Sequence, residues 1–142
     1  MGTHYLVDPE VAGGLGPETV MDSTTHPPKV SRLHYEVIDW LGDSIVQTFP
    51  CHLVLRGVAR RFAAEGFTGF RTGEATVSAS EDFHELNPGG EVPDLVWLLV
   101  DGEPGVADLG LTDRARLVVS ERVLDVLKSG TLDAGTFSPW PV

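Results

Sequence analysis

Histidines and carboxylates are the residues of this chain whose types and spacing suit chemistry. The five histidines are His4, His26, His34, His52 and His84. No two of them have the i, i+4 spacing of a helical zinc site, and Cys51 is the sole cysteine, so the sequence predicts no metal and no cofactor. His34 and Glu36 alternate onto one face of a predicted strand. With His52 and Arg56 they form the polar set on which a small enzyme or a small-molecule-binding domain would depend.

Sequence motifs typical of enzymes are absent. The stretch Gly13-Gly14-Leu15-Gly16 lacks the following Lys-Ser/Thr of a phosphate-binding loop, and the chain contains no Gly-x-Ser-x-Gly. Glu81 and Asp82 share a helical face with Glu85, which suits acid–base catalysis or a divalent ion, but the ligand spacing of a calcium loop is absent. We therefore interpret these acids as solvated helix residues, and the sequence favours a binding protein over an enzyme.

Charge is distributed unevenly along the chain. Residues 72–113 contain no lysine or arginine but ten carboxylates, within a net charge of −11. One part of the surface is therefore expected to be strongly negative, which attracts cationic partners and repels nucleic acid and anionic membranes. The cluster of Arg56, Arg60 and Arg61 is expected to pair with the chain's own acids. The alternative is that the negative charge confers solubility alone.

An acidic partner-binding surface is the hypothesis that follows from this distribution. Its acidic members are Glu81, Asp82, Glu85, Glu91, Asp94, Asp101, Glu103 and Asp108. Trp40, in a predicted turn, and Trp140, in the C-terminal tail, are the aromatic side chains expected to anchor a contact. The expected partner is a cationic protein domain rather than nucleic acid or a membrane, and the oligomeric state stays open.

Size and composition fit one globular domain. A chain of 142 residues that is 42% hydrophobic can bury a core of its own. Cys51, between Pro50 and the apolar run 53–55, is predicted to be a buried thiol. The N-terminus has no basic segment before an apolar core, and no apolar run approaches the about 20 residues of a membrane span. These features predict a cytoplasmic protein.

Local patterns predict the elements that would position these residues. The predicted strands cover residues 5–7, 30–38, 44–49, 52–56, 75–78, 95–100, 116–120 and an edge strand at 136–137; the predicted helices cover 57–65, 80–86 and 121–129. Residues 1–29 are expected to be mostly extended loop, packed down by Val11, Leu15, Val20 and Met21. Residues 1–142 are thus predicted to form a single α+β domain, whose core, residues 30–142, contains two strand–helix units. Its mixed β-sheet has residues 95–100 at the centre, and two or three short helices pack on it.

Two stretches of the sequence resemble a known family. They are Leu117-Val118-Val119-Ser120-Glu121-Arg122-Val123-Leu124-Asp125-Val126-Leu127, after an apolar β run, and Phe49-Pro50-Cys51-His52-Leu53-Val54-Leu55, before a short helix. Together they resemble the immunity proteins of bacterial polymorphic toxin systems, in particular relatives of the myxobacterial contact-dependent immunity proteins with a double Cys-x-x-Cys-Gly motif. With one cysteine, this chain lacks that motif. The resemblance implies a cytoplasmic protein that binds and neutralises a cognate secreted toxin, and an acidic surface suits a cationic toxin domain.

Overall fold

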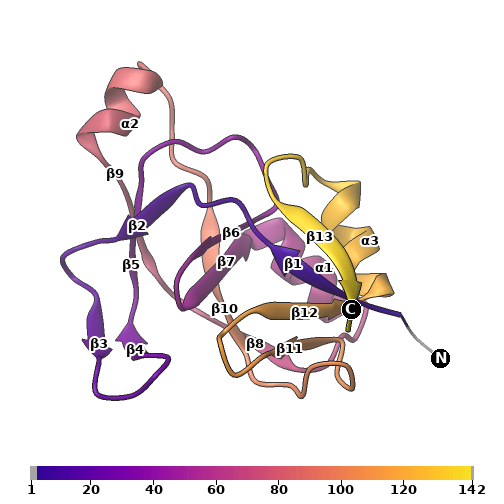
Figure 1. Cartoon of the computed structure of the whole chain (residues 1–142). Coiled ribbons are helices and arrows are strands. Elements are labelled where there is room, and N and C mark those ends of the chain that lie inside the picture. Colours follow the sequence, from indigo (N-terminus) through magenta and orange to yellow (C-terminus); the bar gives the residue numbers. More distant parts are fainter. Residues whose placement is uncertain (1–2, 142) are drawn as a thin grey trace.

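Residues 3–141, the part of the chain that the computed structural model describes, form three helices and thirteen strands (Figure 1). The helices are α1 (Arg56–Ala64), α2 (Glu81–Leu86) and α3 (Glu121–Ser129). The strands are β1 (His4–Asp8), β2 (Gly13–Leu15), β3 (Val20–Asp22), β4 (Lys29–Arg32), β5 (His34–Val37), β6 (Ile45–Thr48), β7 (Cys51–Leu55), β8 (Phe70–Gly73), β9 (Thr76–Ala79), β10 (Leu95–Val100), β11 (Leu109–Leu111), β12 (Leu117–Ser120) and β13 (Thr136–Trp140). The predicted fold class, a single α+β domain with short helices, is confirmed.

Two four-stranded sheets contribute to the larger core. Their strand orders are β11-β12-β1-β13 and β6-β7-β10-β8, and all their neighbouring strands are antiparallel. The buried cluster takes side chains from both sheets and from α1 and α3, among them Val7, Val54 and Phe62. β10 lies between β7 and β8, which confirms the interior position predicted for residues 95–100 from their continuous apolar run. The sheet around it was predicted to be mixed, but it is antiparallel throughout.

The two longer helices pack mainly on different sheets. α1 contacts β7 and β10, whereas α3 contacts β12 and β1 and also lies against α1. The prediction that both helices pack on the sheet of residues 95–100 is therefore wrong for α3. Its preceding strand, β12, pairs with β1, where Leu6 lies opposite Val118. That pairing joins distant parts of the chain, and a local sequence pattern does not reveal it.

A second, smaller core lies against the sheet β2-β5-β9. β5 pairs antiparallel with β2 and parallel with β9, so this is the one mixed sheet among the described residues. Leu33, Tyr35 and Val37 are each at most 1% exposed, as their alternation predicts. The predicted strand 30–38 is interrupted at Leu33, where β4 ends and β5 begins, and β4 instead forms a separate hairpin with β3.

The N-terminal region has more regular structure than predicted. Residues 1–29 were expected to be mostly extended loop after a strand at residues 5–7. β1 confirms that strand, but β2 and β3, which pair with β5 and β4, were not predicted. Of the four side chains expected to pack this region down, Leu15 contacts the smaller core, whereas Val11, Val20 and Met21 are 68%, 54% and 41% exposed. All residues of β3 are exposed, whereas Val30 on the paired strand β4 packs against the smaller core.

Serine caps fix the starts of two helices, as the sequence predicts. Ser80 Oγ accepts a hydrogen bond from the Phe83 N–H at 3.1 Å, and Ser120 Oγ accepts one from the Val123 N–H at 3.4 Å. Because Ser80 directly follows β9, α2 starts where that edge strand ends. Its first turn then presents acids to solvent at the end of the helix where the dipole favours them.

Candidate functional site

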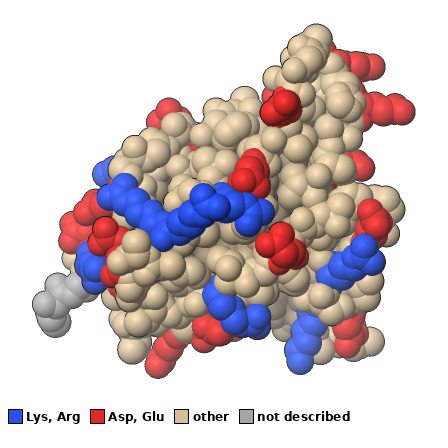
Figure 2. All heavy atoms as spheres, turned by 180° about the vertical axis from the view of Figure 1, so that it is seen from behind, with Lys and Arg blue, Asp and Glu red and all other residues tan. Residues whose placement is uncertain are grey.

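α2 stands out from the body of the molecule, at the end opposite the two termini (Figure 1). Its main tertiary contact is with β9, and Phe83, 3% exposed, is its one buried residue. Figure 2 shows acidic side chains on more than one side of this projection. Within residues 3–141, Glu81, Asp82 and Glu85 form no ion pair. α2 is therefore a negatively charged projection that a single apolar side chain holds in place.

The predicted acidic surface divides into two groups. β10 runs between them as an extended strand, with Asp94 just before it and Asp101 just after it. An extended segment of this length spans about 23 Å, so these two aspartates lie at opposite ends of the sheet. The chain places Glu81, Asp82, Glu85 and Glu91 before Asp94, and Glu103 and Asp108 after Asp101. The eight acids therefore do not form one continuous surface.

Two of these acids already have basic partners. The Arg56 Nε–H donates to both carboxylate oxygens of Asp94, at 3.2 and 3.1 Å. The Arg71 Nε lies 3.8 Å from an Asp101 oxygen. All four side chains are more than a third exposed, so each pair contributes little to stability. The pairs nevertheless lower the charge that Asp94 and Asp101 present to a partner.

Asp108 has a structural role. Its carboxylate accepts hydrogen bonds from the backbone N–H of Thr68 at 2.9 Å and from the hydroxyl of Ser120 at 2.8 Å. Partial burial opposes the ionisation of Asp108, but these hydrogen bonds outweigh it and lower the pKa of the carboxyl. The predicted acids that remain without such partners among the described residues are Glu81, Asp82, Glu85, Glu91 and Glu103.

Both tryptophans that were expected to anchor a partner are half-buried. Trp40 packs against the smaller core, and its indole N–H donates to the Asp43 carbonyl at 3.0 Å. Trp140 lies in β13 opposite His4, with its ring against Gly105. The apolar side chain that accompanies the free acids is instead Leu86, which is 60% exposed at the end of α2. α2 has six residues and two apolar side chains, and only one of them can be buried against the neighbouring strand. The shortness of the predicted helix was therefore the signal for an exposed Leu86, and it was missed.

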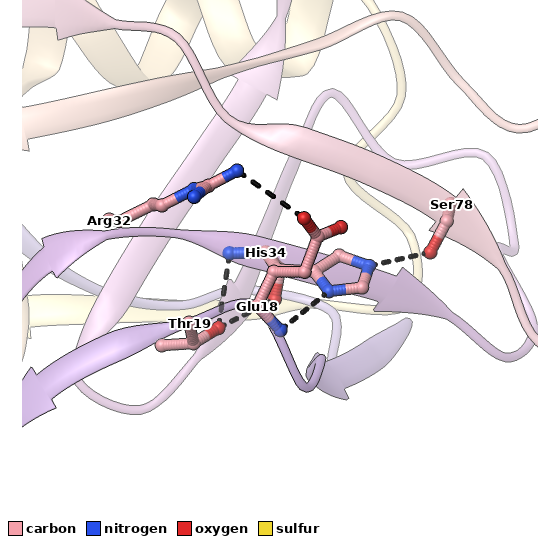
Figure 3. A network of polar contacts seen from close by, with 5 residues as sticks. All are labelled: Glu18, Thr19, Arg32, His34 and Ser78. Carbon is pink, nitrogen blue, oxygen red and sulfur yellow. Dashed lines mark hydrogen bonds and ion pairs between the residues drawn. The ribbon is translucent and has the colours of Figure 1, made fainter.

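His34 lies at the centre of a polar network that joins β5, β9 and the segment after β2 (Figure 3). Its Nε2 lies 2.7 Å from Ser78 Oγ, and the backbone N–H of Glu18 donates to its Nδ1 at 3.2 Å. The Thr19 hydroxyl donates to the His34 carbonyl, and the His34 N–H donates to Thr19 Oγ1, both at 3.1 Å. Arg32 pairs with the Glu18 carboxylate at 3.3 Å. These contacts attach residues 18 and 19 to the sheet.

Ser78 and His34 are as close as a serine–histidine catalytic pair, but the histidine tautomer is unsuitable. Because the Glu18 N–H donates to Nδ1, that nitrogen carries a lone pair, and the neutral ring has its proton on Nε2. Nε2 therefore donates to Ser78. A general base would have to accept the serine proton at this same nitrogen. The geometry supports a structural role for the pair.

The predicted polar set of His34, Glu36, His52 and Arg56 is distributed over three elements. His34 and Glu36 lie on β5, Arg56 begins α1, and His52 lies on β7, in another sheet. His52 is 3% exposed, and its Nε2 has no hydrogen-bond partner among the described residues. The hydrogen-bond partners of His34 and Arg56 are different residues. Among residues 3–141, no group of three or more His, Cys, Asp and Glu side chains is arranged to hold a metal ion.

Cys51 is buried, 5% exposed, which confirms the prediction made from its apolar surroundings. Burial raises the pKa of its thiol to about 11. Since the thiolate is the reactive species, we expect Cys51 to react with a disulfide reagent at pH 7.5 at least about 100-fold more slowly in the folded protein than in denaturant. A spectrophotometric thiol assay measures both rates, and comparable rates would show that the thiol is accessible.

Basic side chains lie on the face of the molecule opposite to that seen in Figure 1. Figure 2 shows a band of basic side chains across the middle of this face. A cavity of about 510 Å³ between α1 and β8 is lined by Arg56, Arg60 and Arg71. Arg56 pairs with the chain's own acids, as predicted, whereas Arg61 donates to the Ser129 hydroxyl at 2.7 Å and Arg60 has no ion pair among the described residues. The prediction of acidic partners is thus confirmed for one member of the predicted cluster.

Two buried carboxylates were missed by the sequence analysis. Asp43 is fully buried, and its carboxylate accepts the backbone N–H groups of residues 133–135 at 2.9, 3.1 and 2.7 Å. Glu10, 5% exposed, accepts the N–H groups of Leu41 and Asp43, and burial raises the pKa of Glu10 in spite of these bonds. Both side chains join segments that are distant in the sequence, and their role is structural.

Comparisons with protein-family models, curated proteins and solved structures give no match for this chain. The resemblance to immunity proteins consequently depends on the two sequence stretches alone. None of the helices in residues 3–141 is long and apolar enough to cross a membrane. The exposed, unpaired acids of α2 are therefore the feature from which a function can be argued.

Proposed function

We propose that this chain is a cytoplasmic immunity protein that binds a cognate cationic toxin domain and blocks it. The observation that carries the proposal is the projecting helix α2, whose acids Glu81, Asp82 and Glu85 are exposed and without ion pairs among the described residues. Nothing in the packing of α2 requires these charges, since Phe83 alone is buried. The dipole of α2 favours Glu81 and Asp82 in its first turn, and their carboxylates remain exposed to a partner.

Two contributions to binding are expected from α2. Its negative charge accelerates the encounter with a cationic domain, and this effect weakens as salt shortens the Debye length from about 10 Å at 0.1 M to about 3 Å at 1 M. Leu86, 60% exposed on the same helix, supplies an apolar contact that slows dissociation once the complex has formed.

Reversal of two α2 charges tests the proposal. In the variant Glu81→Lys/Glu85→Lys we expect the association rate with the toxin domain encoded beside this chain's gene to fall about ten- to a hundredfold at low salt, with a smaller change in the dissociation rate. The fold is expected to remain intact, because reversing an exposed charge in the first turn of a helix costs only about 1 kcal/mol or less through the helix dipole. Surface plasmon resonance at 50 mM and 500 mM salt gives both rates.

The matched control is Glu121→Lys/Asp125→Lys in α3. This pair has the same spacing, also begins at the first residue after a serine cap, and both side chains are exposed. We expect it to change the association rate several-fold less than the α2 variant does. Equal effects of the two variants would mean that net charge alone drives the encounter, and no measurable binding or growth protection by the native protein would exclude the immunity function.

A further inference from the structure

β9 is an edge strand with an unpaired side. It is the last strand in the order β2-β5-β9. On its paired side, the Thr76 N–H donates to the Leu33 carbonyl at 3.0 Å, and the Ser80 N–H donates to the Val37 carbonyl at 2.9 Å. In a parallel pair, alternate residues face the neighbour, so the N–H and C=O groups of Val77 and Ala79 point away from β5. No described residue forms a hydrogen bond with these groups, which we call the β9 edge.

The β9 edge lacks the features that protect other edges of this protein. β6 is covered by Glu10, whose carbonyl accepts the Gln47 N–H at 2.9 Å, and β13 contains Pro139. β9 has the sequence Thr-Val-Ser-Ala, with no charge, no proline and no bulge in its pairing with β5. An edge without charge, proline or bulge can pair with another chain, and the four-residue length of β9 limits that pairing to two of its residues. Val77 and Ala79 are half-buried against the smaller core, so the strand is held in place for such pairing.

Acidic side chains lie at both ends of the β9 edge. Glu74 precedes the strand, and its side chain is 84% exposed. Its ion-pair partner is Arg56, at 3.7 Å, but Arg56 also pairs with Asp94 at 3.1 Å. Glu81 and Asp82 follow the strand in the first turn of α2. An extended segment lying along the edge would therefore have carboxylates near both of its ends.

We infer that the β9 edge binds an extended, lysine- or arginine-containing segment of a protein partner as an additional strand. The backbone of this segment pairs with Val77 and Ala79, and its basic side chains lie near Glu74, Glu81 and Asp82. The inference extends the proposed function and depends on it for the identity of the partner, since the toxin domain would supply the segment. It adds a binding mode in which main-chain hydrogen bonds give affinity and the acids select a basic sequence.

A synthetic peptide tests the inference without the toxin. The probe is a ten-residue peptide of alternating lysine and valine, and amide hydrogen exchange of the intact protein is followed by NMR. We expect exchange at Val77 and Ala79 to slow at least about tenfold at saturating peptide, because both N–H groups become hydrogen-bonded. A peptide of alternating glutamate and valine is expected to have no effect. Lysine–valine peptide that binds without protecting these two amides would overturn the inference.

Two changes to the backbone separate strand addition from simple charge attraction. Ala79→Pro removes one N–H of the edge but none of the bonds to β5, and we expect it to weaken lysine–valine peptide binding at least about tenfold. Ala79→Val is the matched control, since it keeps the N–H, and its affinity should stay within about threefold. If Ala79→Pro does not fold, the test uses two lysine–valine peptides instead, one methylated on the odd-numbered and one on the even-numbered backbone nitrogens. Strand addition would be contradicted if both methylated peptides bound as tightly as the unmethylated one.

The same variants distinguish this inference from the proposed function. Toxin binding that is lost in Glu81→Lys/Glu85→Lys but unchanged in Ala79→Pro would leave the immunity function in place and refute the β9 edge as its site. Loss in both variants, with Ala79→Val unaffected, supports both proposals. Peptide binding at the edge without any binding of the toxin domain would refute the proposed function and leave an edge that takes basic segments from another source.

Discussion

Replacement of Asp43 with alanine is expected to lower the free energy of unfolding by about 2–4 kcal/mol. The carboxylate accepts three backbone N–H groups from residues 133–135, and the substitution leaves them without an acceptor. Gly135 is buried, so its N–H incurs a penalty of about 1–3 kcal/mol, whereas Asp133 and Ala134 are exposed and their N–H groups recover part of the loss from water. Urea unfolding followed by circular dichroism measures the difference.

A graded series makes this prediction specific to the hydrogen bonds. Asp43→Asn keeps one acceptor oxygen, so we expect its free energy of unfolding to lie between that of the native protein and that of Asp43→Ala. Asp133→Ala is the control, because it truncates an exposed side chain of the same loop and keeps the N–H that Asp43 uses; its effect should be below about 0.5 kcal/mol. A loss in Asp43→Ala no larger than in this control would mean that the loop does not depend on the carboxylate.

Asp43 also illustrates why part of the structure could not be predicted from the sequence. The element predictions succeeded where the signal is local: Leu95–Val100 is a continuous apolar run, and Ser80 and Ser120 precede amphipathic segments. Asp43 follows Gly42 and has the local appearance of a turn residue. Its three partners come about 90 residues later, and no spacing rule connects such positions.

Strand pairing was the main source of error in the predicted fold. β1 and β12 meet although they stand at opposite ends of the chain, and this contact moves α3 to a different sheet from α1. The short strands β8 and β11 were not predicted, because Phe70–Gly73 and Leu109–Leu111 each contain a glycine, which strands disfavour, and are too short for an alternation to outweigh it. Their strand conformation depends on the neighbours β10 and β12 rather than on their own residues.

The acidic residues were predicted as exposed members of one surface, and the structure separates two of them. Glu81, Asp82 and Glu85 are exposed as expected, but Asp94 and Asp101 lie on opposite ends of β10. The sequence contained the information for this separation. A strand predicted over residues 95–100 is about 20 Å long, so acids on its two sides cannot be direct neighbours.

Acid is expected to destabilise the protein through His52. Burial lowers the pKa of this imidazole to about 4, from 6.5 in the unfolded chain, and the opposing attraction of Asp8 is weaker. Between pH 6.5 and 4 the unfolded chain binds a proton at this site and the folded protein does not, so the free energy of unfolding decreases as the pH falls through this range. With about 1.4 kcal/mol for each pKa unit, the full loss is about 3 kcal/mol.

Comparison of the native protein with His52→Leu isolates this contribution. The variant also removes the buried Nε2 that has no partner among the described residues, so at pH 7.5 we expect it to be as stable as the native protein or more stable. Between pH 7.5 and pH 4 its free energy of unfolding should decrease by about 3 kcal/mol less than that of the native protein. The carboxylates titrate alike in both proteins, so this difference reports His52 alone. His84→Leu, at an exposed position of α2, should follow the native curve. Urea unfolding at pH 7.5, 5.5 and 4 gives the three curves, and equal acid sensitivity of the native protein and His52→Leu would show that the folded protein accommodates the protonated imidazole.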